Sequence, residues 1–174
     1  MRSQRIIGVL GLSLVTATSF AHAAPGFEPR ARAPRMAVHA PDSLRIAIAI
    51  AEAERFAVVG RFAEARRRYR AAAEEQRTDG ASPAHTFWLL ASSYFADGDE
   101  IGAARALGSA ADAAAEFGDP ELELRANFEA AVLYANNRRA DLAMPRLERA
   151  RRLLKSPAIS NEQRKSIERR MGGR

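Results

Sequence analysis

The sequence lacks the residues on which most catalytic and metal sites depend. Its 174 residues contain no cysteine, which excludes disulfides, thiolate nucleophiles and thiolate metal ligands. Only three histidines occur, His22, His39 and His85, and none has a second ligand at the spacing that a zinc or copper site needs. No glycine-rich phosphate loop is present. We therefore expect no cofactor, no metal and no enzymatic activity, in a fold that packing alone must stabilise.

Lysine is almost as scarce, because Lys155 and Lys165 are the only two. Arginine supplies the remaining positive charge, and residues 24–174 carry 25 Lys and Arg against 21 Asp and Glu, a net charge of +4. The densest cluster, residues 66–70, fans its arginines around a predicted helix that also carries glutamates at pairing distance. Such a pattern is typical of a solvated helix face, so we expect no nucleic-acid partner.

Residues 1–23 have the three parts of a secretory signal peptide. Arg2 and Arg5 give a positive start, residues 6–20 are mostly apolar, and Ala21-His22-Ala23 is a small-x-small cleavage sequence. The apolar run is shorter than an uncleaved membrane anchor requires. We predict cleavage after Ala23, a periplasmic or extracellular location, and no transmembrane segment in the exported product.

Residues 24–41 contain prolines at positions 25, 29, 34 and 41, together with three arginines. Proline at this density disfavours helix and sheet, which predicts a flexible linker. The alternative is an arm that docks on an acidic partner or an anionic lipid.

An internal repeat organises the rest of the chain. Residues 87–111 are predicted to form two short helices hinged at Gly98-Asp99, and their pattern returns 38 residues earlier and 40 residues later. The matching sets are Ala49, Ala53, Phe56, Gly60, Ala65, Tyr69 and Ala72; Phe87, Leu90, Ala91, Tyr94, Gly98, Ala103, Leu107 and Ala110; and Ala130, Ala131, Tyr134, Arg138, Ala143, Leu147 and Ala150. Glu52 replaces Leu90 in the first set, and Asn127 replaces Phe87 in the third. The pattern predicts three helical hairpins with small residues where two helices approach closely.

At these residues the chain resembles the tetratricopeptide repeat family. The segment GRFAEARRRYRAAA, residues 60–73, has glycine, an aromatic, alanine, an aromatic and alanine in that family's usual order. The resemblance covers residues 46–154, although the spacing exceeds the family's common repeat of about 34 residues and Arg138 replaces the third hinge glycine. It implies an all-α helical-hairpin solenoid, with three hairpins over residues 42–156 and a C-terminal capping helix and tail over residues 157–174.

Local signals predict where the helices begin and end. The start signals are Asp42, Ser82-Pro83, Asp119-Pro120 and a capping box of Ser160 with Gln163 ahead of a last helix from Asn161 to about Met171. Gly118 is predicted to end the central hairpin in a left-handed turn. Pro145 is expected to kink its helix or to delay its start.

The resemblance also implies where a partner binds, because the first helices of such hairpins line a concave face. The residues placed on that face are Ile50, Trp88, Ser92, Phe95, Phe128 and Val132. Two interpretations stay open for Trp88, since an aromatic residue here is either part of the core or the anchor of a binding groove. Phe95 and Phe128 are candidate groove residues on the same grounds.

We therefore expect a non-catalytic scaffold or adaptor of the cell envelope that binds a peptide or a helix of another protein in an apolar concave groove. One alternative is a carrier that holds an apolar small molecule or a lipid in the same groove. The other is a structural module whose apolar face makes a homo-oligomer.

Overall fold

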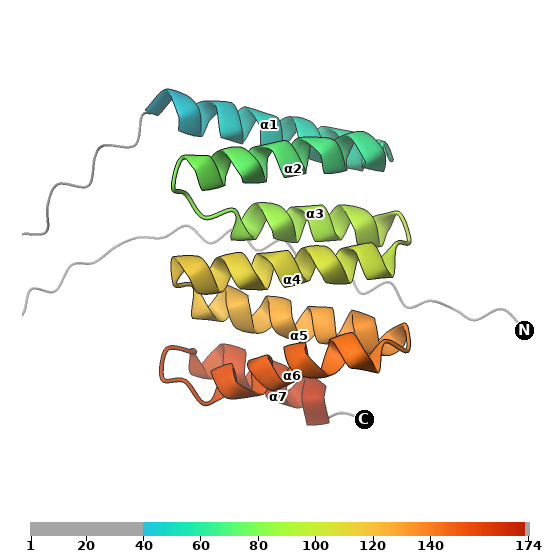
Figure 1. The fold of residues 1–174 in the computed structure, drawn as a ribbon, viewed down its shortest axis with the longest axis vertical. Helices are drawn as coiled ribbons and strands as arrows, with labels where there is room; N and C mark the ends of the chain where they lie inside the picture. The colour runs from blue at the N-terminus through green and yellow to red at the C-terminus, as the bar shows by residue number, and fades with distance from the viewer. Residues whose placement is uncertain (1–39, 173–174) are drawn as a thin grey trace, which may run out of the picture. The chain divides into compact units, whose positions relative to one another are not determined.

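A computed structural model describes residues 40–172, with side chains from Ser43 onward, and this part of the chain is all-α with no strand. Its seven helices follow one another in chain order (Figure 1). They are α1 (Ala40–Val58), α2 (Phe62–Thr78), α3 (Ala84–Ala96), α4 (Glu100–Phe117), α5 (Pro120–Asn136), α6 (Ala140–Leu154) and α7 (Asn161–Gly172). The predicted all-α class is confirmed. The predicted signal peptide, and the predicted linker up to residue 39, lie outside the described residues.

Each helix from α1 to α6 packs against the next, and α7 packs back against α5. Short turns reverse the chain between them, so neighbouring helices run antiparallel. One core cluster extends from Ala53 on α1 to Ala143 on α6, and a second joins Leu124 on α5 to Ile167 on α7. Between residues 40 and 172, no helix is long and apolar enough to cross a membrane.

Alanine occupies the interior positions of the helix contacts. Nine alanines that recur in the three hairpins are each at most 6 % exposed: Ala53, Ala65, Ala72, Ala91, Ala103, Ala110, Ala131, Ala143 and Ala150. Because alanine presents only a methyl group, the backbones of two helices approach closely at such points, and a larger side chain collides with the neighbouring helix. Tyr69, Leu107 and Tyr134 belong to the same core cluster and fill the space beside the small residues.

The turn inside each hairpin has one residue in the left-handed conformation. Gly60 has φ +76° and Gly98 has φ +83°, which glycine adopts without steric cost. Arg138 holds the equivalent place in the third hairpin with φ +58°, and it is the only non-glycine residue of the described range with positive φ. The hinge is therefore kept even where the sequence has no glycine, at the cost of a contact between Cβ and its own carbonyl group.

Two predicted helix boundaries are confirmed. The Asp119 side chain accepts a hydrogen bond from the Leu122 amide at 3.0 Å, and Pro120 begins α5. Gly118 ends α4 with φ +75°. Asp99 also caps α4, accepting from the Gly102 amide at 2.7 Å.

Two predicted starts are wrong, by three residues at α1 and by one residue at α3. Helix α1 begins at Ala40, so Asp42 lies within its first turn and not before it. Pro41 fits there because the first residues of a helix need no amide donor. Helix α3 begins at Ala84, so Pro83 precedes the helix, and the Ser82 hydroxyl accepts from the Ala84 amide at 3.4 Å.

The capping box of α7 forms only in part. The Ser160 hydroxyl accepts from the Gln163 amide at 3.4 Å, as predicted. The Gln163 side chain, however, donates to the carbonyl oxygen of Glu121 on α5, and the Ser160 amide donates to the Glu121 carboxylate at 3.0 Å. Glu121 of α5 thus supplies the acceptor for the Ser160 amide, which in a complete capping box would be the Gln163 side chain.

Pro145 does not delay the start of its helix. Helix α6 begins at Ala140 and contains Pro145 as an internal residue. The amides of Leu142 and Ala143 donate to the carbonyl of Arg139 at 3.1 and 2.9 Å, so the first turn is closed before the proline is reached.

Replacing a contact alanine tests the close approach of the helices. We expect Ala103→Leu to lower the free energy of unfolding by about 1–3 kcal/mol, because its methyl group is 1 % exposed and the added atoms overpack the core. Urea denaturation measures this. The matched control is Ala47→Leu on the exposed side of α1, which should change stability by less than about 0.5 kcal/mol. Equal effects of the two substitutions would contradict the interpretation.

The left-handed conformation of Arg138 predicts a substitution that raises the free energy of unfolding. We expect Arg138→Gly to stabilise the protein by about 0.5–1 kcal/mol, since glycine removes a left-handed penalty of about 1–2 kcal/mol and adds a smaller entropic cost in the unfolded chain. Gly98→Ala, at the equivalent turn, should destabilise it by about 1 kcal/mol or more. Thermal and urea denaturation of both variants check the pair, and a loss of stability in Arg138→Gly would refute the assignment.

Candidate interaction site

An apolar pocket of about 330 Å³ opens between α5 and α6 beside the end of α7. Its lining consists of Phe128, Ala131, Val132, Ala135, Ala140, Ala143, Met144, Leu147, Arg151, Arg170 and Met171. Nine of these eleven residues are apolar and none is acidic. The volume lies at the small end of the range for ligand pockets, which suits one or two apolar side chains of a partner.

Two side-chain contacts place α7 beside α5. Gln163, near the start of α7, donates to the carbonyl oxygen of Glu121, near the start of α5. Arg170, near the end of α7, makes a two-pronged ion pair with Glu129, one of its bonds being 2.9 Å. Helices α7 and α5 therefore run side by side in the same direction.

The difference in length between these two helices creates the pocket. By the pairing above, the end of α7 at Gly172 is level with Ala131, whereas α5 continues to Asn136. About five residues of α5, or roughly 7 Å of helix, extend past α7. Val132 and Ala135, on this stretch of α5, line the pocket.

The two positively charged residues of the lining differ in their partners. The Arg170 guanidinium lies 4.7 Å from the centre of the Phe128 ring, and its hydrogen bonds to Glu129 raise the pKa of the guanidinium. Arg151 is exposed and makes no ion pair with any described residue. The pocket therefore combines an apolar wall with Arg151, a cation that has no countercharge among residues 43–172.

The structure corrects the placement of Phe128. Its side chain is 4 % exposed and packs with Leu124, Leu153 and Ile167, because α7 lies over this part of α5. Phe128 is thus a core residue whose ring reaches the pocket wall, and it is not an open groove residue. Val132, one turn further along α5, lines the pocket and is half-buried.

The other predicted residues lie elsewhere. Trp88 is half-buried in clusters with α4 and α5, and the Arg125 guanidinium lies 4.8 Å from its ring centre, which is the arrangement that the core interpretation predicts. Ile50 is half-buried in the main core, and the Ser92 hydroxyl donates to the Trp88 carbonyl at 3.2 Å. Phe95 is 52 % exposed near the end of α3. The pocket brings together Phe128 and Val132 and none of these four residues.

Sequence reasoning missed Met144, which lines the pocket and is 48 % exposed. The predicted binding residues all lie on the first helix of a hairpin, whereas Met144 lies on α6, a second helix. The signal was present, because Met144, Leu147 and Arg151 lie at i, i+3 and i+7 and so share one face of α6.

Sequence reasoning also missed an exposed apolar stripe on α1. Its members are Leu44, Ala47, Ile48, Ala51 and Val58, all of them exposed. Their spacing of three, four and seven residues is the helical period, so the sequence does carry the signal of this stripe.

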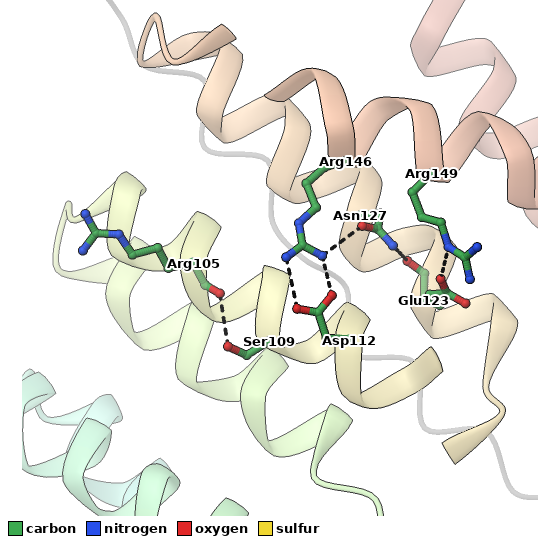
Figure 2. A network of polar contacts seen from close by, with 7 residues as sticks. All are labelled: Arg105, Ser109, Asp112, Glu123, Asn127, Arg146 and Arg149. Atoms are coloured by element: carbon green, nitrogen blue, oxygen red, sulfur yellow. Dashed lines mark hydrogen bonds and ion pairs between the residues drawn. The ribbon is translucent and has the colours of Figure 1, made fainter. Parts of the chain in front are cut away.

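A polar network joins α4, α5 and α6 (Figure 2). The Arg146 guanidinium donates to both carboxylate oxygens of Asp112, at 2.6 and 3.1 Å, and to the side-chain oxygen of Asn127 at 3.3 Å. Asn127 is 2 % exposed at the position where the central repeat has an aromatic residue, and its amide donates to the Glu123 carbonyl at 3.0 Å. Buried polar groups need hydrogen-bond partners, and Arg146 supplies one to the side-chain oxygen of Asn127.

The same network holds a buried carboxylate. Glu123 is 5 % exposed and accepts a hydrogen bond from Arg149. Asp97 and Asp99, the acidic pair in the central turn, are also engaged, since Asp97 accepts from Arg66 at 2.8 Å and Asp99 caps α4. In the part of the chain that the structure describes, no group of three or more acidic or histidine side chains is placed to hold a metal ion.

Comparison with known proteins gives no relative: no protein-family model matches the chain, and neither a curated protein nor a solved structure matches it.

The buried carboxylate gives a prediction for the network. We expect Arg149→Met to lower the free energy of unfolding by about 1–3 kcal/mol, because the substitution keeps the aliphatic stem and leaves Glu123 without its cation. The control is Arg152→Met, where an exposed arginine without an ion pair among the described residues is lost, and its effect should stay below about 0.5 kcal/mol. Urea denaturation at neutral pH compares them, and equal effects would show that the ion pair contributes little.

Proposed function

We propose that this protein is a non-catalytic interaction scaffold that receives a helix or peptide segment of another protein in the pocket between α5 and α6. The observation that carries the proposal is the docking of α7. A short amphipathic helix lies along α5, buries Ile167 and contributes Met171 to the pocket wall. The surface of α5 and α6 therefore has the apolar character that a docked helix needs, and α5 continues about five residues beyond the level of Gly172.

The scaffold belongs, in this proposal, to the tetratricopeptide type of helical-hairpin solenoid. Support comes from three features that recur with the 38- and 40-residue spacing of the sequence. The nine alanines occupy buried positions, a left-handed residue closes each hairpin, and each hairpin packs against the next. A capping helix with one buried apolar residue and a charged outer side completes such a stack.

We further propose that the protein acts in the cell envelope after export. This rests on the signal sequence of residues 1–23 and its cleavage motif. The absence of cysteine suits a protein whose stability does not depend on oxidation.

A test isolates the protein from its native cell and examines it by native mass spectrometry, with and without extraction by organic solvent. We expect a polypeptide adduct that resists extraction. Met144→Glu should remove it, because an apolar side chain of the partner can then pack at this position only if the carboxylate loses its hydration.

The matched control is Ile48→Glu, which places the same charge on an exposed apolar residue of α1 and should keep the adduct. An adduct that extraction removes would support a small-molecule carrier in place of a scaffold. A bare dimer that grows with protein concentration, and that Ile48→Glu abolishes, would assign the apolar stripe of α1 to self-association and count against the proposal.

A further inference from the structure

The structure assigns a specific chemistry to the partner: we infer that the pocket receives an amphipathic helix whose first turn carries a carboxylate, which pairs with Arg151, and whose next turns place apolar side chains against Met144 and Val132. This inference rests on the proposed function, since it specifies the segment that the same pocket binds. It names Arg151 as the residue that selects acidic partners.

Charge complementarity carries the first step. Residues 130–172, which form the pocket side of the stack, contain eleven Lys and Arg against four Asp and Glu, whereas residues 79–129 contain two against ten. The pocket itself has two guanidinium groups and no acid among its lining residues. Within the lining a basic partner would therefore meet like charge, whereas an acidic one is favoured both in its approach and in its bound position.

The two arginines of the lining differ in their partners, and Arg151 is the one that can pair with a carboxylate of the bound helix. Glu129 already neutralises Arg170 through two hydrogen bonds, and the Phe128 ring covers one side of its guanidinium. Arg151 has no such partner among the described residues. A carboxylate that enters the pocket gains most by pairing with Arg151.

The positions along α6 orient the partner. Both guanidinium groups of the lining lie on the α7 side of the pocket, because Arg170 is on α7 and Arg151 follows Arg146 and Arg149, which bond Asn127 and Glu123. A helix that continues along α5 in the direction of α7 begins on that side. Its own first turn favours Asp or Glu, because the amino end of a helix is positively polarised. Apolar residues three and four positions later then face the pocket.

The experiment selects ligands from a display library of random peptides of about 14 residues, a length that spans roughly 20 Å as a helix. The purified full chain is the target, and peptides are kept if Met144→Glu abolishes their binding. Methyl signals of Met144 and Met171, which both line the pocket, report binding there by NMR. We expect the selected peptides to carry Asp or Glu followed by apolar residues at helical spacing.

Charge-swap measurements then test Arg151. We expect Arg151→Gln to weaken a selected peptide about 2- to 5-fold and Arg151→Glu by more, consistent with a partly exposed ion pair. Replacing the peptide's acidic residue by lysine should restore binding to Arg151→Glu. The matched control is Arg152→Gln, which removes a neighbouring exposed arginine outside the pocket and should leave the affinity within about 1.5-fold.

The outcomes separate this inference from the proposed function. Pocket-binding peptides that are neutral or basic, or that bind Arg151→Gln and Arg152→Gln equally, would keep the scaffold and overturn the role of Arg151. Failure to select any peptide that shifts the Met144 and Met171 signals would overturn both proposals. If decanoate shifts those signals in the same experiment and no peptide does, the pocket is that of an amphiphile carrier.

Discussion

Close contact between helices at alanine is the constraint on which this structure depends. Nine alanines in equivalent places of the three hairpins are buried, and a methyl group at each lets neighbouring backbones approach. Larger residues beside them, such as Tyr69 and Leu107, then fill a shallow interior. Because the contacts are so close, the turns must be short, and this requires a left-handed residue at Gly60, Gly98 and Arg138. The hinge strain at Arg138 is a local consequence of the global packing.

Arginine supplies the second layer of contacts between hairpins. Residues 79–129 are strongly acidic, and arginines of the flanking segments reach into them: Arg66 pairs with Asp97, Arg77 with Glu116, Arg146 with Asp112 and Arg149 with Glu123. The planar guanidinium binds two acceptors at once, as Arg146 does with Asp112 and Asn127 (Figure 2). Lysine has no such geometry, which gives a physical role to the excess of arginine over lysine.

In the proposed function, the binding site lies where α5 continues past the level of Gly172 at the end of α7. Helix α7 shields the end of the stack by burying Ile167, but it is shorter than α5. The uncovered remainder is an apolar pocket with a cation, Arg151, that has no countercharge among the described residues. The same helix thus both closes the core and defines the size of the site. The apolar stripe on α1, at the other end of the stack, is a second exposed apolar surface. Helix α1 has no comparable excess of one sign of charge.

Much of the fold follows from the sequence, because it depends on interactions that are local along the chain. The helical period, the left-handed turns at glycine and the caps at Asp119 and Gly118 involve residues a few positions apart, and these were predictable. The site was less so. That Phe128 lies beneath α7, that Glu121 completes the cap at Ser160, and that Met144 and Arg151 face the end of α7 are contacts between segments distant in sequence. They depend on the relative lengths and register of packed helices, which no local pattern encodes and only the tertiary structure decides.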